Sequence, residues 1–378
     1  MVKNIKKLLS LLFALTIVAG MIPVRTEAAT TENIVLQESV TVEFVQIPVL
    51  ETEGFLQEDA AAEALCRQMQ QRSENIIIKV CSDDENYEQL FYRIMDKACA
   101  HTGDPTAGDY LYWHRSGYRG NIWGDYINGT YYYIFSYEVY YITTAQQEAE
   151  LTAAVDALLA QLALTDKSDY EKICGIYEYM TQNITYDYEN LEDETHTLKY
   201  SAYAALVNKT AVCQGYASLF YRLALELGVD CRLVAGIGSG GPHGWNIVAL
   251  DGKYYNVDAT WDSSWVQAGW DYNYFLRCED NFEDHTRDPE YDTTQFHAAY
   301  PMDSADYVPK PKIEYGDANG DGKVDGNDAT LLLQYAAGWN VEIHMVAADA
   351  NGDGKVDGND ATLLLQYAAG WNVTLGAA

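Results

Sequence analysis

Residues 211–262 read AVCQGYASLFYRLALELGVDCRLVAGIGSGGPHGWNIVALDGKYYNVDATWD. Apolar residues recur three and four positions apart in the first part, which predicts a helix from about Cys213 to Gly228. Its apolar stripe is expected to consist of Phe220, Leu223, Ala224 and Leu227. Strand-like runs follow at 229–237, 243–250 and 253–258. This order of a helix and hairpin-forming strands predicts an α+β core.

A tight turn at Asp251–Gly252 is expected to align two of these strands. Asp-Gly between strand-like runs is a strong signal for a two-residue β-turn. Such a turn pairs Leu250 with Lys253, and the register then places His243 one diagonal step from Asp258. Diagonal neighbours lie roughly 7–8 Å apart, within reach of longer side chains. We therefore predict that the imidazole of His243 meets the carboxylate of Asp258, which would fix its tautomer and orientation.

Cys213 is the candidate nucleophile. It is expected at the start of the predicted helix, where the partial positive charge of the helix terminus favours a thiolate over a thiol. A cysteine taken alone is more often a buried apolar residue, as we expect for Cys231 in its strand. A helix-start cysteine, a strand histidine and an aligned aspartate together indicate nucleophilic catalysis by Cys213, His243 and Asp258.

These segments resemble the transglutaminase-like core of bacterial proteins. The similarity extends upstream through YMTQNITYDYEN (179–190) and YSAYAALVNKT (200–210), and downstream through YFLRCEDNFEDHTRDPEY (274–291). The resemblance covers about residues 146–300. It implies a papain-like fold with a helical lobe and an antiparallel sheet, and it places the family's catalytic triad on the three residues named above.

The resemblance also implies a reaction, amide acyl transfer. The thiolate attacks an amide carbonyl, releases an amine or ammonia and forms a thioester, which water or an amine then resolves. His243 acts as base and then as acid, and Asp258 orients it. The backbone N–H of Cys213 is a candidate oxyanion donor, whereas Trp245 and Tyr216 are expected to shape the cleft. No cofactor is expected for catalysis.

A second feature is the segment DANGDGKVDGNDATLLLQYAAGWNV, which occurs twice, at 317–341 and 349–373. Each copy opens with an acidic loop of alternating oxygen-bearing side chains, with a glycine that permits a sharp turn. Calcium takes roughly six to eight oxygen ligands, and this alternation turns successive oxygens toward one centre. We predict two calcium ions, bound with a backbone carbonyl from each lysine, by Asp317, Asn319, Asp321, Lys323, Asp325 and Asp328, and by Asp349, Asn351, Asp353, Lys355, Asp357 and Asp360.

The loops depart from an EF-hand in two respects. Each ends in Asp where the EF-hand has Glu, and no helix is expected before either loop. A calcium loop followed by one helix, present in two copies, resembles a type I dockerin over about residues 315–375. The resemblance implies a small all-α module that docks onto a cohesin of a scaffolding protein, as in cellulosomes.

The predicted helices offer a docking surface. At 3.6 residues per turn, Leu333 lies opposite a face made of Leu331, Leu332, Tyr335 and Ala336. Leu333 is therefore an apolar side chain left for a partner. The resemblance implies cohesin contacts at Gly326, Asn327, Leu333, Gln334, Gly358, Asn359, Leu365 and Gln366. Because the two copies are identical, we expect that either can bind the cohesin.

The N-terminus indicates export. Lysines at 3, 6 and 7 precede an apolar run, and small residues fit cleavage after Ala28, so residues 1–28 are expected to be a signal peptide. No other stretch is long enough to span a bilayer. We expect a secreted protein without a membrane partner, at the cell surface or in a free extracellular multi-enzyme complex.

The amino-acid composition excludes some classes of binding partner. The formal net charge of −32 disfavours nucleic acids and anionic membranes. Seven cysteines in an exported chain allow disulfides, although buried free thiols are an equal alternative.

The segments predict a domain order. Residues 29–145 carry strand-like runs, such as NIIIKV (75–80) and TYYYIFSYEVYYI (130–142), around a helical stretch near 86–101, which predicts an α+β support domain. Helical periodicity follows at 145–164 and 167–184, so the catalytic domain is expected at 146–305. A proline-containing linker (306–314) then leads to the dockerin (315–378).

We expect a peptidase-like or deamidase-like hydrolysis of protein or peptide substrates, because an extracellular site is surrounded by water. Protein cross-linking is the nearest enzymatic alternative. A non-catalytic binding or structural module of the complex, and a carbohydrate-processing component, remain open as alternatives of other classes.

Overall fold

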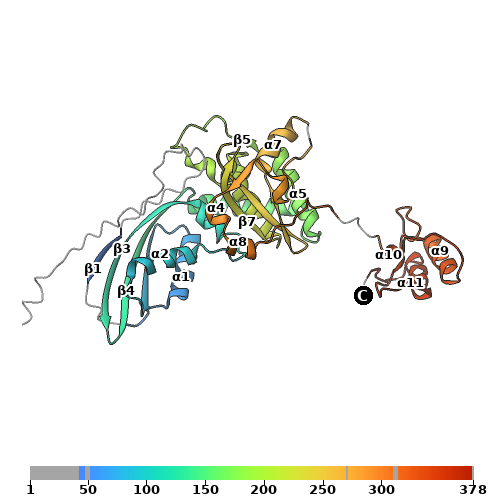
Figure 1. Cartoon of the computed structure of the whole chain (residues 1–378), viewed down its shortest axis with the longest axis horizontal. Helices are drawn as coiled ribbons and strands as arrows, with labels where there is room; N and C mark the ends of the chain where they lie inside the picture. Colours follow the sequence, from blue (N-terminus) through green and yellow to red (C-terminus); the bar gives the residue numbers. More distant parts are fainter. Residues whose placement is uncertain (1–41, 47–51, 270, 310–313, 377–378) are drawn as a thin grey trace, which may run out of the picture. The chain divides into compact units, whose positions relative to one another are not determined.

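The computed structural model describes residues 42–46, 52–269, 271–309 and 314–376. The predicted signal peptide and part of the predicted linker (310–313) lie outside the described residues. Contacts divide the chain into two compact units, one that ends at Tyr307 and one that begins at Val308 (Figure 1). Each unit is described by itself.

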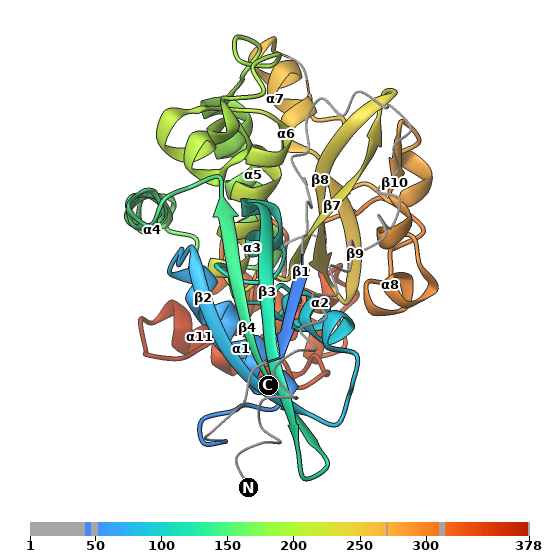
Figure 2. The ribbon, with the colours of Figure 1, turned by 90° about the vertical axis from the view of Figure 1, so that its left-hand side faces the viewer.

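The first unit begins with a four-stranded sheet that carries two helices on one face (Figure 2). The helices are α1 (Glu58–Gln70) and α2 (Tyr87–Ala98). The strand order is β1-β3-β4-β2, with β1 parallel to β3 and the other neighbours antiparallel. The strands are β1 (Val42–Gln46), β2 (Asn75–Ser82), β3 (Arg115–Ile127) and β4 (Thr130–Tyr141). The predicted α+β character of this region is confirmed.

The sequence does not predict strand β3, because its sequence RSGYRGNIWGDYI is rich in glycine, which weakens a strand signal. Packing explains one of these glycines. A Cβ at Gly120 would lie 2.2 Å from the ring of Phe91 on α2, so only glycine lets the helix approach the strand. Helices α1 and α3 (Asp109–His114) are also absent from the sequence prediction.

Helices α4 (Ala145–Leu162) and α5 (Asp169–Asn183) lie where the sequence predicts them. Each starts with a capping box. The hydroxyl of Thr144 or Ser168 accepts a hydrogen bond from a backbone N–H three residues on, and that residue's side chain accepts from the N-cap N–H. These reciprocal bonds fix where the helical lobe begins.

The central helix α6 (Cys213–Glu226) differs from the prediction of a single apolar stripe, because every residue from Cys213 to Leu225 is buried. The helix packs against strands on one side and against α5 on another, so it has no solvent face. Gly228 then adopts a φ of +76°, a left-handed conformation that suits glycine after the end of a helix.

The second four-stranded sheet of this unit has the order β10-β7-β8-β9. Its strands are β7 (Cys231–Gly238), β8 (Gly241–Leu250), β9 (Lys253–Val257) and β10 (His285–Arg287). The predicted turn is present, with φ of +52° at Asp251 and +78° at Gly252, and Leu250 pairs with Lys253 as predicted. The sequence does not predict β10, which lies in a polar segment.

Short elements complete the first unit. β5 (Thr185–Tyr186) pairs with β6 (Thr210–Ala211) just before α6. Helix α7 (Ala259–Gln267) follows β9 directly. The remaining elements are η2 (Thr197–Tyr200), η3 (Ala204–Asn208), η4 (Glu279–Asn281), η5 (Pro289–Tyr291) and α8 (Thr294–Ala299).

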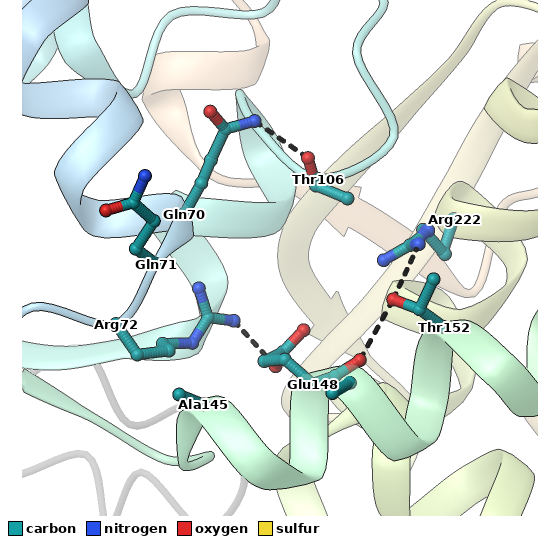
Figure 3. A pocket seen from close by; sticks show the side chains of 9 residues that line it. Gln70, Gln71, Arg72, Thr106, Ala145, Glu148, Thr152 and Arg222 are labelled. Atoms are coloured by element: carbon teal, nitrogen blue, oxygen red, sulfur yellow. Dashed lines mark hydrogen bonds and ion pairs between the residues drawn. The ribbon is translucent and has the colours of Figure 1, made fainter.

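A buried ion pair connects the N-terminal part of this unit to the helical lobe. Nη2 of Arg72, just after α1, lies 2.6 Å from Oε1 of Glu148 on α4 (Figure 3). The hydroxyls of Tyr110 and Thr143 also donate to this carboxylate. Arg72 and Glu148, together with Arg222 of α6, line a polar cavity of about 250 Å³.

The second unit is a small all-α fold, as predicted. Its helices are α9 (Gly326–Ala336), α10 (Met345–Ala348) and α11 (Gly358–Ala368). Its core consists of Ala318, Ala329, Leu332, Ala348, Ala350, Ala361 and Leu364. The expectation that no helix precedes either loop is wrong for the second loop, which follows the one-turn helix α10. Ala348 is buried in the core, and its N–H donates to the carbonyl of His344, which closes that turn.

Candidate active site

The predicted histidine–aspartate contact is present. Nε2 of His243, on β8, lies 2.7 Å from Oδ2 of Asp258. Asp258 follows β9 and caps α7, where its Oδ1 accepts hydrogen bonds from the backbone N–H groups of Thr260 (2.9 Å) and Trp261 (3.2 Å). The hairpin register therefore brings the two side chains together, and the cap fixes the carboxylate.

Cys213 completes the cluster from the other side. It is the first residue of α6 and is only 1 % exposed. A negative charge on its sulfur acts to raise the pKa of His243, so the two side chains are neighbours. Because Nε2 faces Asp258, Nδ1 is the nitrogen available to the sulfur. Gly215 allows the first helical turn to lie close to strand β6, since a Cβ there would be 2.7 Å from that of Ala211.

The electrostatics of the cluster favour a charged imidazole. Burial acts to lower the pKa of His243, but the Asp258 carboxylate and the Cys213 sulfur outweigh burial and raise that pKa to about 10. Burial acts to raise the pKa of Asp258, but the hydrogen bonds and charges of His243 and His285 hold it below its ordinary value. The site therefore stabilises an imidazolium between a carboxylate and a sulfur.

His285 contacts the same carboxylate and was given no role in the sequence analysis. Its Nε2 lies 3.2 Å from Oδ2 of Asp258. His285 lies on a strand of three residues, too short for a periodic signal. The segment 274–291, which contains His285, resembles the transglutaminase-like family. That resemblance is the sequence signal that could have identified this residue. In the described part of the chain, His243, Asp258 and His285 form the only group of three histidine, cysteine or acidic side chains close enough to share a metal ion. Direct hydrogen bonds already account for their arrangement.

Two tyrosines are close enough to Cys213 to be affected by its charge. Burial and the charge of a thiolate at Cys213 raise the pKa of both Tyr186 and Tyr200. Their hydroxyls therefore stay protonated and can donate hydrogen bonds. The pairing of β5 with β6 places Tyr186 opposite Ala211, two residues before Cys213.

The residues expected to shape the cleft are both buried. The hydroxyl of Tyr216 donates to the carbonyl of Ile184 (2.7 Å), and Nε1 of Trp245 donates to Oδ1 of Asn256 (3.2 Å). The ring of Trp245 lies at a centroid distance of 6.2 Å from the imidazole of His243. Both residues therefore support the walls of the site rather than face solvent.

The two acidic loops of the second unit differ in the contacts of their first aspartate. In the first, the carboxylate of Asp317 accepts backbone N–H groups of Gly320, Asp321 and Gly322 at 2.8–3.1 Å. In the second, Oδ2 of Asp349 accepts from Gly354 (2.8 Å), while its Oδ1 is buried without a hydrogen-bond partner. A buried carboxylate oxygen that lacks a donor fits a cation ligand. The donor set of both loops is therefore compatible with calcium.

The loop ends are alike. In each loop the last aspartate, Asp328 or Asp360, is buried, and its two oxygens accept one backbone N–H from within the loop and one from the N-cap residue. The remaining predicted ligands lie on the loops between these ends: Asn319, Asp321, Lys323 and Asp325 in the first, and Asn351, Asp353, Lys355 and Asp357 in the second.

The exposure of the residues on the predicted docking surface largely agrees with the helical periodicity. Leu332 and Leu364 are fully buried, whereas Leu333 and Leu365 are each 48 % exposed. Ala336 was predicted on the inward face but is exposed, because it lies at the C-terminal end of α9, beyond the residues of the core. Gly326, Asn327, Gly358 and Asn359 are at the exposed starts of α9 and α11, and Gln334 and Gln366 are half-buried beside the leucines.

All seven cysteines carry free thiols. Of the two alternatives left open by the sequence, disulfides or free thiols, the structure has free thiols. Searched over the described residues, no helix has the length and apolar character needed to cross a membrane.

Comparisons with known proteins agree with the sequence motifs. Residues 156–259 match the transglutaminase-like superfamily, and residues 315–367 match the dockerin type I domain. The kyphoscoliosis peptidase of Mus musculus is 27 % identical over 139 residues, and that of Homo sapiens is 28 % identical over 128 residues. The matched regions cover 34 % and 31 % of this chain but only 21 % and 19 % of those peptidases. The chain thus spans about one fifth of the length of these relatives.

A crystal structure described as that of a TGase is 17 % identical, with a TM-score of 0.29, and the alignment covers 55 % of this chain and 59 % of the other. Type I dockerin domains typically bind calcium and imply cohesin binding in general. The chain therefore contains a transglutaminase-like core followed by a C-terminal type I dockerin.

Proposed function

We propose that this protein is a secreted cysteine hydrolase that cleaves amide bonds of protein or peptide substrates and is held on a scaffold through its dockerin. One observation carries the proposal. The imidazole of His243 lies 2.7 Å from Asp258, and Cys213, at the start of a buried helix, is close enough for its sulfur to raise the pKa of His243. A nucleophile, a base and an orienting carboxylate in contact are the arrangement of acyl-transfer catalysis.

The first half-reaction forms a thioester. The Cys213 thiolate attacks the amide carbonyl carbon and forms a C–S bond, and the backbone N–H of Cys213 stabilises the oxyanion. The imidazolium of His243 gives a proton to the leaving nitrogen, so the C–N bond breaks and an amine or ammonia departs. Asp258 keeps the imidazolium oriented and charged until that transfer.

The second half-reaction restores the enzyme. Neutral His243 takes a proton from water, and the resulting hydroxide attacks the thioester carbonyl. The C–S bond breaks, the carboxylic product departs and the thiolate returns beside the reprotonated imidazole. If an amine replaces water, the product is a new amide, which is the cross-linking alternative.

The comparisons support hydrolysis over cross-linking. The two curated relatives are named peptidases. The family match, at residues 156–259, includes Cys213, His243 and Asp258. The similarity that gives this support covers about one fifth of the length of the two peptidases.

The test is a reaction with a panel of peptides in the presence of a labelled primary amine. We expect release of amine or ammonia and no labelled product, and we expect Cys213→Ala to abolish it. Cys174→Ala is the matched control, since Cys174 is a partly exposed thiol away from the cluster. Amine incorporation would replace hydrolysis by cross-linking, and equal turnover in Cys213→Ala would refute a catalytic core.

We further propose that the second unit binds two calcium ions and a cohesin. The ligands are the twelve loop residues from Asp317 to Asp328 and from Asp349 to Asp360 named above, and the unpartnered oxygen of Asp349 supports this assignment. The exposed Leu333 and Leu365, with Gly326, Asn327 and Gln334 and their counterparts Gly358, Asn359 and Gln366, would contact the cohesin. When bound, calcium would neutralise the acidic loops and set the orientation of α9 and α11.

A further inference from the structure

The carboxylate of Asp258 has four hydrogen-bond donors. Its Oδ1 accepts from the backbone N–H groups of Thr260 and Trp261. Its Oδ2 faces Nε2 of His243 at 2.7 Å and Nε2 of His285 at 3.2 Å. An ionised carboxylate offers about four acceptor sites, so every one of them is engaged in this buried position. Only one of the four donors is used by the acyl-transfer steps.

His285 is held rigidly against this carboxylate. β10 pairs with β7, which aligns His285 with Gly238, and the backbone N–H of His285 donates to the carbonyl of Phe282 (3.0 Å). Its ring stacks on that of Phe282 at a centroid distance of 3.8 Å and packs 4.3 Å from that of Trp261. The side chain is 1 % exposed. An imidazole confined in this way has little freedom to leave Asp258.

The neighbouring strands bring both histidines to the same oxygen. His243 pairs with Gly236 and His285 with Gly238, so β7 lies between the two strands that carry them. A Cβ at Gly238 would lie 3.0 Å from Cβ of His243 and 2.9 Å from the ring of Trp261. The glycine thus permits the close packing that lets two imidazoles share one carboxylate.

We propose that His285 is a positioning residue that acts through Asp258, in addition to the three residues assigned above. Its Nε2–H donates to Oδ2 and holds the carboxylate in the plane in which it meets His243. Loss of this donor leaves a buried charge with one bond fewer and a freer orientation, so His243 is less well aimed at the Cys213 sulfur. This inference rests on the proposed function and adds a residue that no comparison assigns.

Two substitutions separate the hydrogen bond from packing. His285→Phe keeps a stacked ring but has no donor, whereas His285→Gln places an amide N–H near the position of Nε2 and loses the ring. The readout is the rate at which iodoacetamide alkylates Cys213, followed by mass spectrometry of its peptide in the full chain. This reaction reports the thiolate beside His243 and needs no substrate.

We expect His285→Phe to slow Cys213 alkylation about tenfold, the factor that one hydrogen bond to a charged group supports. His285→Gln should restore the rate to within about threefold of the wild type, since it supplies the donor. In an Asp258→Asn background, His285→Phe should have almost no further effect, because the two residues act in one network. Alkylation of Cys231, which is fully buried, reports unfolding in the same samples.

Three results would overturn the inference. These are a wild-type rate in His285→Phe, a rate in His285→Gln as slow as in His285→Phe while Cys231 stays protected, or an equal effect of His285→Phe with and without Asp258. If the rate differences appear as expected but no peptide is cleaved, the positioning role stands and the hydrolase proposal fails. If wild-type Cys213 reacts no faster than Cys174, both are refuted.

Discussion

The two units of this protein encode their sites in opposite ways. In the C-terminal unit, all six proposed ligands of each calcium lie within one continuous loop, and the whole loop is repeated. In the transglutaminase-like core, the proposed catalytic residues Cys213, His243 and Asp258 come from a helix start, a strand and a helix cap, and only a hairpin register brings the last two together. A local site can be recognised from spacing, whereas a dispersed one also needs the topology.

The comparison also predicts that the two sites function independently of each other. The catalytic cluster uses no residue beyond the first unit, and the calcium loops use none from it. Changes in one site should therefore leave the other intact.

The largest effect is expected from Cys213→Ala. Removing the nucleophile should lower kcat/KM for amide hydrolysis by about 10⁴- to 10⁶-fold. Cohesin affinity, measured by calorimetry on the same sample, should be unchanged. A parallel loss of cohesin binding would contradict the independence of the two units, and Cys174→Ala serves as the matched control.

Asp258→Asn should lower kcat/KM by about 10²- to 10⁴-fold, because the amide cannot hold the imidazolium. It should also alter the pH profile. In the wild type the pKa of His243 is raised to about 10, so the alkaline decline should lie near pH 10. In the variant this decline should move toward pH 6.5, the ordinary pKa of histidine. Identical alkaline declines would show that Asp258 does not set the charge of His243.

The same shift predicts a stability effect. The folded-state pKa of His243 lies above its ordinary value, so the stabilisation is complete below pH 6.5 and is lost as the pH rises through about 10. Melting temperatures measured across this window should fall for the wild type and change less for Asp258→Asn. An unchanged wild-type melting temperature would count against the charged imidazole.

Calcium removal should weaken cohesin binding by about 10²-fold or more, because the uncompensated loop carboxylates repel one another and the helix ends lose their support. Calorimetry with a matching cohesin, before and after chelation and again after calcium is restored, measures this effect. Hydrolysis in the chelated sample should continue. Loss of hydrolysis that calcium restores would place a metal requirement in the catalytic core.

The smallest effect is expected from a single change on the docking surface. Leu333→Asp should reduce cohesin affinity only about twofold, because the identical repeat with Leu365 remains. The double variant Leu333→Asp and Leu365→Asp should lose about 100-fold, as expected when an exposed apolar anchor is removed. A full loss from the single variant would show that the two surfaces are not equivalent.

Much of the fold was predictable from local signals. The Asp-Gly turn gave the register of β8 and β9, and periodicity located α4 and α5, which capping boxes then delimit. Strand β3 and the one-turn α10 were not predictable, because glycine content hides the first and tertiary burial of Ala348 sustains the second. The role of His285 was not predictable either, because tertiary contacts, the pairing of β10 with β7 and the stacking on Phe282, fix its position.

The most direct test of the catalytic claim is detection of the thioester. The protein is mixed with glutamine- and asparagine-containing peptides, quenched in acid within the first turnover and analysed by mass spectrometry. We predict an acyl adduct on Cys213, absent from Cys213→Ala, that decays to free acid when the quench is delayed. Peptide cleavage without any adduct on Cys213, or an adduct on another of the seven cysteines, would contradict the account.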